Sequence, residues 1–259
     1  MTTSYSTITE LPNEKVPLEQ ILRITERYCW ASKFAIEQDV LECACGAGQG
    51  ADLLNSISHS YVAADYDKGL ISIAKQNNPV VNFKVFDALN IPFDDGSFDV
   101  VLICEALYYF SDISKFLQEA KRVLRRGGKI LIVSANPGLF DFNPSPFTYT
   151  YPSVTDMGEY FNINGFKYIS AEGGTSTAES GLRQKLLRPV KLIASRLNLI
   201  PKTMKGKSWL KKMFFGGEFV SMPNSIVCKE NKPIFVNTIE MDKNDTTHKV
   251  LYFVGEKIL

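Results

Sequence analysis

A carboxylate followed by three evenly spaced glycines is the first feature of this sequence that could do chemistry. Glu42 lies in the apolar run 39–43, and Gly46, Gly48 and Gly50 follow at every second position. Glycines between a strand and a helix allow the backbone to approach a ligand closely. Glu42 would repel the pyrophosphate of a dinucleotide but would attract a cationic amino group. The motif favours a nucleotide-like ligand with a positive charge, and a tight turn without a ligand is the alternative.

Acidic residues also end the next two apolar runs. Asp65 can accept hydrogen bonds from both hydroxyls of a ribose, whereas Asp67 fits the N-cap of the following helix better than Asp65 does. Asp87 can accept a hydrogen bond from an adenine amino group, and the backbone of Ala88 and Leu89 could complete recognition of the base. Together with the glycine motif, the two carboxylates favour a ligand that contains adenosine.

A second group of polar residues follows the fourth apolar run, 98–104. Cys104 and Glu105 lie at its carboxyl end, and Tyr108 and Tyr109 come shortly after. A general base is needed only where an acceptor must lose a proton, and Glu105 is the first candidate for that role. Tyr108 and Tyr109 could orient an acceptor or contact a cation through their rings. The alternative is a helical turn that packs on the sheet.

Short apolar runs alternate with helical patterns along most of the chain. The expected strands are 39–43, 61–65, 81–86, 98–104, 129–134 and 166–173, and the expected helices are 17–37, 51–58, 68–76, 113–124 and 154–163. Near-continuous apolar strands that alternate with helices are typical of a parallel sheet covered on both faces. The pattern predicts an α/β fold with a doubly wound, mostly parallel, seven-stranded sheet. Ser111 or Asp112 could cap the helix 113–124, and Gly127 and Gly128 could end it.

The order and spacing of these motifs resemble the class I S-adenosylmethionine-dependent methyltransferase family, whose fold is Rossmann-like. The resemblance covers residues 17–136 and is carried by Glu42-x-Ala44-x-Gly46-x-Gly48, Asp65, Asp87-Ala88 and the run GSFDVVL at 96–102. Ala44 departs from the family, which usually has glycine at this position. The resemblance implies S-adenosyl-L-methionine as the cofactor and methyl transfer as the reaction.

The resemblance also implies roles for particular side chains. Glu42 would lie near the methionine amino group, and Asp65 would hold the ribose hydroxyls. Tyr66 would lie against the adenine, and Tyr28 either closes over the cofactor or is a core residue. The implied cofactor contacts are Tyr28, Glu42, Ala44, Cys45, Gly46, Gly48, Asp65, Tyr66, Asp87, Ala88 and Cys104, and the candidate catalytic residues are Glu105 and Tyr108.

The chain of 259 residues is expected to form one methyltransferase domain. Residues 1–37 would be an N-terminal helical cap, and 38–174 the cofactor-binding core. Residues 175–232 would be a basic helical insertion or lid before the last strands, and 233–259 a closing β-hairpin. The hairpin is expected because no long turn separates the apolar runs 232–241 and 248–259.

The segment 181–212 bears on the methyl acceptor because it contains ten lysines and arginines and no acidic residue. A basic amphipathic cover packed on the body is its structural interpretation. The functional alternatives are a lid over an anionic or sugar-type acceptor, peripheral contact with an anionic membrane, and RNA binding. Aromatic residues are sparse here, which disfavours nucleic acid. A small-molecule or glycan-type acceptor, methylated at O or N, is expected, with surface-polysaccharide or natural-product biosynthesis as its context.

Composition limits the remaining possibilities. No apolar run reaches the roughly 18 residues of a membrane span, and the N-terminus lacks the features of a secretory signal. The five cysteines include no C-x-x-C pair, so buried reduced thiols and a cytoplasmic location are expected, and no metal site is expected. An RNA methyltransferase, a cofactor-binding module without catalysis and a nicotinamide oxidoreductase stay open as alternatives, as does the oligomeric state.

Overall fold

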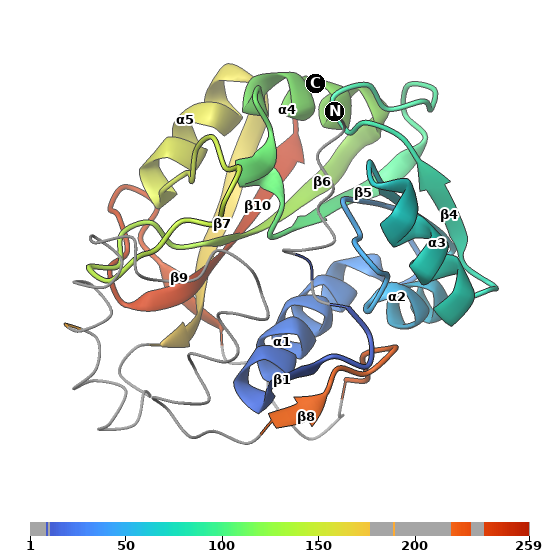
Figure 1. The fold of residues 1–259 in the computed structure, drawn as a ribbon. Helices are drawn as coiled ribbons and strands as arrows, with labels where there is room; N and C mark the ends of the chain where they lie inside the picture. The colour runs from blue at the N-terminus through green and yellow to red at the C-terminus, as the bar shows by residue number, and fades with distance from the viewer. Residues whose placement is uncertain (1–8, 10, 177–188, 190–218, 229–235, 259) are drawn as a thin grey trace.

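An eight-stranded sheet lies at the centre of the computed structural model, which describes residues 9, 11–176, 189, 219–228 and 236–258 (Figure 1). The strand order is β4-β3-β2-β5-β6-β10-β7-β9. The strands are β2 (Asp39–Cys43), β3 (Ser60–Asp65), β4 (Asn82–Val85), β5 (Phe98–Cys104), β6 (Leu124–Ala135), β7 (Phe166–Ser176), β9 (Val236–Ile239) and β10 (His248–Lys257). Strands β2 to β6 are parallel, whereas β10, β7 and β9 join in antiparallel pairs. The predicted α/β class and mostly parallel sheet are confirmed.

Helices cover both faces of this sheet (Figure 1). They are α1 (Leu18–Ala35), α2 (Ala51–Ile57), α3 (Lys68–Asn77), α4 (Ile113–Val123) and α5 (Val154–Ile163), and each was predicted from the sequence. Successive side chains of a strand point to opposite faces. In β5, Val100 and Leu102 therefore join the apolar cluster that contains α1, α2 and α3, whereas Val101 and Ile103 join the cluster that contains α4 and α5.

The helix starts follow the capping residues of the sequence. Asp67 caps α3 by accepting hydrogen bonds from two backbone N–H groups, and Asp112, rather than Ser111, caps α4. Helix α4 ends at Val123, one residue before the predicted end, and β6 begins directly at Leu124, so the helix stops before it reaches Gly127 and Gly128. Leu124 is fully buried and pairs with the start of β5, so burial of its side chain fixes the boundary ahead of the glycines.

The predicted closing hairpin is also wrong. Strand β10 lies between β6 and β7, and β9 pairs with β7 on the far side. The residues 250–255 of β10 are buried in succession, as expected for a strand in the middle of a sheet, whereas β9 is largely exposed at the edge. The sheet thus has eight strands rather than the seven expected, because β9 extends it at this edge.

A second, two-stranded sheet was not predicted from the sequence. β1 (Lys15–Pro17) pairs antiparallel with β8 (Phe219–Ser221), next to the start of α1 (Figure 1). Most of the predicted basic insertion, including 181–212 apart from residue 189, lies outside the described residues. None of the described helices has the length and apolar character needed to cross a membrane.

A disulfide bond corrects the expectation that all five cysteines are reduced. Cys29 of α1 is bonded to Cys228, which follows β8, with the two Cα atoms 5.6 Å apart. The two residues are 199 positions apart in the sequence, so only the fold brings them together. Cys43, Cys45 and Cys104 are free. Disulfides persist mainly in oxidising compartments, and the cytoplasmic location stays a prediction.

Alkylation of the unfolded but unreduced protein is expected to label three of its five cysteines, because Cys29 and Cys228 are bonded to each other. Reduction should make all five reactive and should lower the free energy of unfolding by about 2–4 kcal/mol, since the bond closes a long loop. Mass spectrometry and urea unfolding measure these two effects. The double variant Cys29→Ser/Cys228→Ser should not respond to reductant, and labelling of all five cysteines without reductant would contradict the bond.

Candidate functional site

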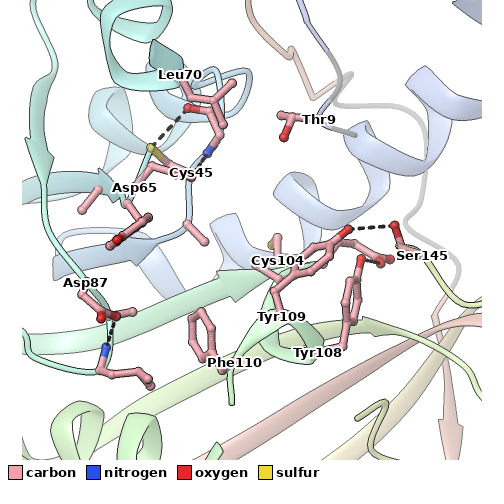
Figure 2. Close-up of a pocket in the computed structure, with 18 of the residues that line it drawn as sticks. Thr9, Cys45, Asp65, Leu70, Asp87, Cys104, Tyr108, Tyr109, Phe110 and Ser145 are labelled. Atoms are coloured by element: carbon pink, nitrogen blue, oxygen red, sulfur yellow. Dashed lines mark hydrogen bonds between the residues drawn. The ribbon is translucent and has the colours of Figure 1, made fainter. Parts of the chain in front are cut away.

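A cavity of about 670 Å³ opens at the carboxyl ends of the parallel strands (Figure 2). Its walls come from the turns after β2, β3, β4 and β5, from one face of α1 and from residues 145–149. Binding sites for small molecules commonly enclose roughly 300–1,000 Å³ and lie at this edge of α/β sheets. Size and position therefore identify this cavity as the candidate functional site.

Most of the residues expected at the site from the sequence line this cavity. They are Tyr28, Ala44, Cys45, Gly46, Asp65, Tyr66, Asp87, Ala88, Cys104, Glu105 and Tyr108. Glu42 and Gly48 are not among the described residues that line it. The two histidines are also elsewhere, because His59 pairs with Asp39 on the surface and His248 pairs with Asp245.

Asp65 ties the tip of β3 to the glycine-rich turn. One carboxylate oxygen accepts a hydrogen bond from Gly46 N at 2.9 Å, and the other accepts from Asp67 N at 2.8 Å. Burial raises the pKa of Asp65, while these backbone hydrogen bonds act in the opposite direction. Each carboxylate oxygen has two lone pairs, so Asp65 can hold the turn and still accept hydrogen bonds from a ligand.

Asp87 lies at the same end of the cavity as Asp65 (Figure 2). Its Oδ1 accepts a hydrogen bond from Leu89 N at 2.9 Å, which fixes the turn after β4. The neighbouring Ala88 is buried in the wall, and the residue Tyr66 is 52% exposed. This end of the cavity therefore offers two carboxylates and an aromatic ring to a polar, planar ligand.

Glu42 is buried behind Tyr28 rather than exposed to the cavity. Its carboxylate accepts a hydrogen bond from the Tyr28 hydroxyl at 2.8 Å and another from the Tyr61 hydroxyl. Burial raises the pKa of Glu42 from 4.5 to about 7, against the effect of the two hydroxyls, and the charge of Asp65 raises it further. A ligand in the cavity would thus meet Tyr28 before Glu42, and direct contact of Glu42 with an amino group stays a prediction.

The position of Tyr28 explains one of the glycines. A Cβ atom at Gly50 would lie 2.0 Å from Cε1 of the Tyr28 ring, so no larger residue fits without moving the ring. Gly46, in contrast, has a backbone φ angle of +59°, a left-handed conformation that glycine adopts more readily than other residues. Ala44 also has a positive φ, +57°, which explains why glycine is common at this position in the family that the sequence resembles. Gly50 thus makes room for Tyr28, while Gly46 and Ala44 turn the chain away from β2.

The opposite end of the cavity holds an ion pair that the sequence did not reveal. Arg27 Nη2 lies 3.1 Å from Glu105 Oε1, and the side chains are 12% and 18% exposed. The Tyr108 hydroxyl donates a hydrogen bond to Glu105 Oε2 at 2.8 Å. Glu105 has a φ angle of +52°, which is uncommon for a residue with a side chain and often marks a functional position. The spacing of Ile24, Arg27 and Tyr28 places them on one face of α1, and this spacing could have indicated from the sequence that Arg27 lines the cavity with Tyr28.

Aromatic residues close this end of the cavity. The Tyr109 hydroxyl donates to Ser145 Oγ at 2.9 Å, and Tyr149 N donates to the Tyr108 carbonyl at 2.8 Å. The ring of Tyr151 stacks on that of Tyr108, with centroids 4.2 Å apart. Figure 2 shows Tyr108, Tyr109 and Ser145 gathered on the side away from Asp87. Sequence reasoning missed Ser145 and Tyr149, because they come from a loop without a regular pattern.

The sequence matches a known family over the part that forms most of this cavity. Residues 41–132 match the methyltransferase domain family. A probable S-adenosylmethionine-dependent methyltransferase from Mycolicibacterium smegmatis is 29% identical over 155 residues, which are 56% of this chain and 60% of that protein. A phthiotriol/phenolphthiotriol dimycocerosates methyltransferase from Mycobacterium ulcerans is 42% identical over 102 residues, which are 38% of each protein. The chain therefore matches less than two thirds of the length of these relatives.

Solved structures are similar over most of the chain. The YcgJ protein from Bacillus subtilis covers 93% of this chain, and the match covers 99% of that protein, with a TM-score of 0.56 and 18% identity. An S-adenosylmethionine-dependent methyltransferase from Archaeoglobus fulgidus covers 92%, with 94% of its own chain matched, a TM-score of 0.59 and 14% identity. At such identities the likeness shows the Rossmann-like fold alone.

Replacing Glu42 with glutamine is expected to flatten the pH dependence of stability. The folded protein binds a proton at Glu42 up to about pH 7, whereas the unfolded chain releases it near 4.5. The stability that this proton gives is therefore present at low pH and is lost as the pH rises through about 7. From about pH 5 to about pH 8, the free energy of unfolding of the wild type should fall by about 2–3 kcal/mol more than that of Glu42→Gln.

Urea unfolding at several pH values measures this difference. Glu159→Gln is the matched control, because Glu159 is exposed on α5 and should change neither the stability nor its pH dependence. Parallel pH curves for the wild type and Glu42→Gln would show that Glu42 does not titrate in this range.

Proposed function

We propose that this chain, whose residues 41–132 match the methyltransferase domain family, is an S-adenosylmethionine-dependent methyltransferase that moves a methyl group from S-adenosylmethionine to a small acceptor. The observation that carries this proposal is that the two ends of one cavity differ. One end has two carboxylates at strand tips, and at the other Glu105 is ion-paired with Arg27 and accepts a hydrogen bond from Tyr108. The first end suits an adenosine, and the second suits a group that must lose a proton.

The residues at the first end fit the cofactor by the chemistry of their side chains. Asp65 is a buried carboxylate that can accept from two ribose hydroxyls, and Asp87 can accept from the adenine amino group. The exposed ring of Tyr66 offers a surface on which the base could stack. We propose that Tyr28, with Glu42 behind it, faces the methionine amino group, so that Glu42 acts through the Tyr28 hydroxyl.

The residues at the second end can orient an acceptor and remove its proton. When bound, the cofactor supplies a methyl group that is already activated by a positively charged sulfur. The Tyr108 hydroxyl donates a hydrogen bond to Glu105. The lone pairs of the Tyr108 oxygen are therefore left to accept a proton from an acceptor hydroxyl or amine. As that proton arrives, the proton of Tyr108 passes to Glu105 Oε2. Arg27 holds Glu105 in place for this transfer.

The acceptor is proposed as a small molecule that is methylated at O or N. The relative from Mycobacterium ulcerans is named for a triol, a molecule with hydroxyl groups, which supports an oxygen acceptor here. A second candidate is an anionic or sugar-type acceptor held by the basic segment 181–212. This segment lies outside the described residues apart from residue 189, so the support for the second candidate is its charge alone.

Replacing Asp65 with alanine is expected to weaken the binding of S-adenosylhomocysteine by about 1–3 kcal/mol, because hydrogen bonds to a charged group are lost. Isothermal titration calorimetry measures the affinity, and circular dichroism shows whether each variant is folded. Tyr108→Phe is the matched control, because it removes a hydroxyl from the opposite end of the same cavity and should leave this affinity unchanged.

Three outcomes would count against the proposal, the first from this titration and the others from titrations of the wild type with NADH and with RNA. Unchanged affinity in Asp65→Ala would mean that the ribose lies elsewhere. Binding of NADH, without binding of S-adenosylhomocysteine by the wild type, would favour a nicotinamide oxidoreductase. Strong binding of RNA that weakens steeply with salt would favour an RNA substrate.

A further inference from the structure

Two exposed aromatic residues lie in the loop that contributes Ser145 and Tyr149 to the second end of the cavity. Tyr149 lines the cavity, and yet 68% of it is exposed. Phe147, two positions earlier, is 60% exposed. Large apolar side chains at the mouth of a binding cavity commonly mark a contact with a ligand or partner. We call these two residues the aromatic rim.

The aromatic rim is anchored to the residues that are proposed to act on the acceptor. Tyr149 N donates to the carbonyl oxygen of Tyr108, and Ser145 N donates to the Tyr151 hydroxyl at 2.9 Å. Tyr151 in turn stacks on Tyr108. These contacts join the segment 145–151 to the turn that follows β5, so the backbone of Tyr149 has a fixed place beside that of Tyr108.

The backbone of the rim also shows an unusual conformation. Phe147 has a φ angle of +65°, which is a strained conformation for a residue with a large side chain. A residue keeps such a conformation only where the surrounding structure holds it, and such residues gather at ligand-binding sites. The strain therefore supports a role for this segment in binding, in agreement with the exposure of its side chains.

The second end of the cavity has no spare positive charge among the described residues. Arg27 is the cation among the described lining residues, and its guanidinium is paired with Glu105. The other lining residues at this end include Tyr109 and Ser145, which are aromatic or polar but uncharged (Figure 2). An anionic group placed here would lie close to the Glu105 carboxylate, which is already paired with Arg27, so an uncharged polar group suits the described part of these walls better.

We propose that the methyl acceptor is an amphiphile. Its uncharged, hydroxyl-bearing head lies next to Tyr108 and Glu105, and its apolar part extends out of the cavity across Phe147 and Tyr149. This inference rests on the proposed function for the role of Tyr108, and it adds the chemical class of the acceptor. It requires that binding depend on both parts of the molecule, the hydroxylated head and the apolar tail.

Octyl β-D-glucoside is a suitable probe, because it joins an uncharged sugar head to an alkyl chain. Calorimetry at concentrations below micelle formation should show saturable binding of about one molecule per chain. Glucose has the head alone, and glucose 6-phosphate has an anionic head without a tail, so both should bind at least about tenfold more weakly. Tighter binding of glucose 6-phosphate than of octyl β-D-glucoside would overturn the inference in favour of an anionic acceptor.

Variants of the rim test where the probe binds. Tyr149→Ala and Phe147→Ala should each weaken binding of octyl β-D-glucoside by about tenfold, whereas Tyr149→Phe should keep the affinity because the ring remains. Ile163→Ala is the matched control, because Ile163 is exposed at the end of α5 and does not line this cavity. Equal weakening by Ile163→Ala, or no weakening by Tyr149→Ala and Phe147→Ala, would overturn the inference.

A separate titration with S-adenosylhomocysteine distinguishes this inference from the proposed function. None of the rim variants should change the affinity for S-adenosylhomocysteine, because Ser145 of the same loop lies at the end of the cavity away from Asp87 (Figure 2). If the wild type binds S-adenosylhomocysteine but shows no saturable binding of octyl β-D-glucoside, the proposed function stands and the amphiphilic acceptor is excluded. If it binds the glucoside at the rim but not S-adenosylhomocysteine, the amphiphile site stands and methyl transfer fails.

Discussion

A buried carboxylate joins the parts of the molecule that form the candidate site. Glu42 of β2 accepts hydrogen bonds from Tyr28 of α1 and from Tyr61 of β3, so a helix and two strands meet at one side chain. A carboxyl group that is 1% exposed has lost its contact with water, and these two hydroxyls compensate for part of that loss. The pairing places Tyr28 over Gly50 and so shapes the wall of the cavity at the glycine-rich turn.

The two ends of the cavity differ because they come from different parts of the sheet. The tips of β3 and β4 provide the two carboxylates of the first end, and the turn after β2 provides its glycine-rich wall. These three strands are neighbours in parallel order. The second end uses the tip of β5, the 3-10 turn 107–109 and the loop 145–151, together with Arg27 from α1. One half of the site is thus built from the ends of regular strands, whereas much of the other half is built from a turn and a loop.

This separation also explains how much of the structure could be predicted from the sequence. Strand β2 and helix α5 were predicted to the residue, because apolar periodicity and capping residues are local signals. The bond between Cys29 and Cys228 and the place of β10 between β6 and β7 depend on contacts between distant segments, which no local pattern contains.

The candidate site divides in the same way. Asp65, Asp87 and the glycines follow strands at recognisable spacing, so their place at one edge of the sheet followed from the strand pattern. Arg27 looked like an ordinary charged residue of an amphipathic helix, and its ion pair with Glu105 depends on a contact between distant segments. Ser145 and Tyr149 lie in a loop, where side-chain contacts rather than periodicity determine the structure.

The left-handed conformations of Ala44 and Glu105 affect how related sequences can be interpreted. The two residues follow adjacent strands, and at both points the backbone leaves the sheet sharply, which opens the crevice. A homologue with valine or isoleucine in place of Glu105 would lose the carboxylate and would also strain the bend in the main chain. Homologues with asparagine or glycine there would keep the bend while changing the chemistry, so natural variation at this position can separate the shape of the crevice from its reactivity.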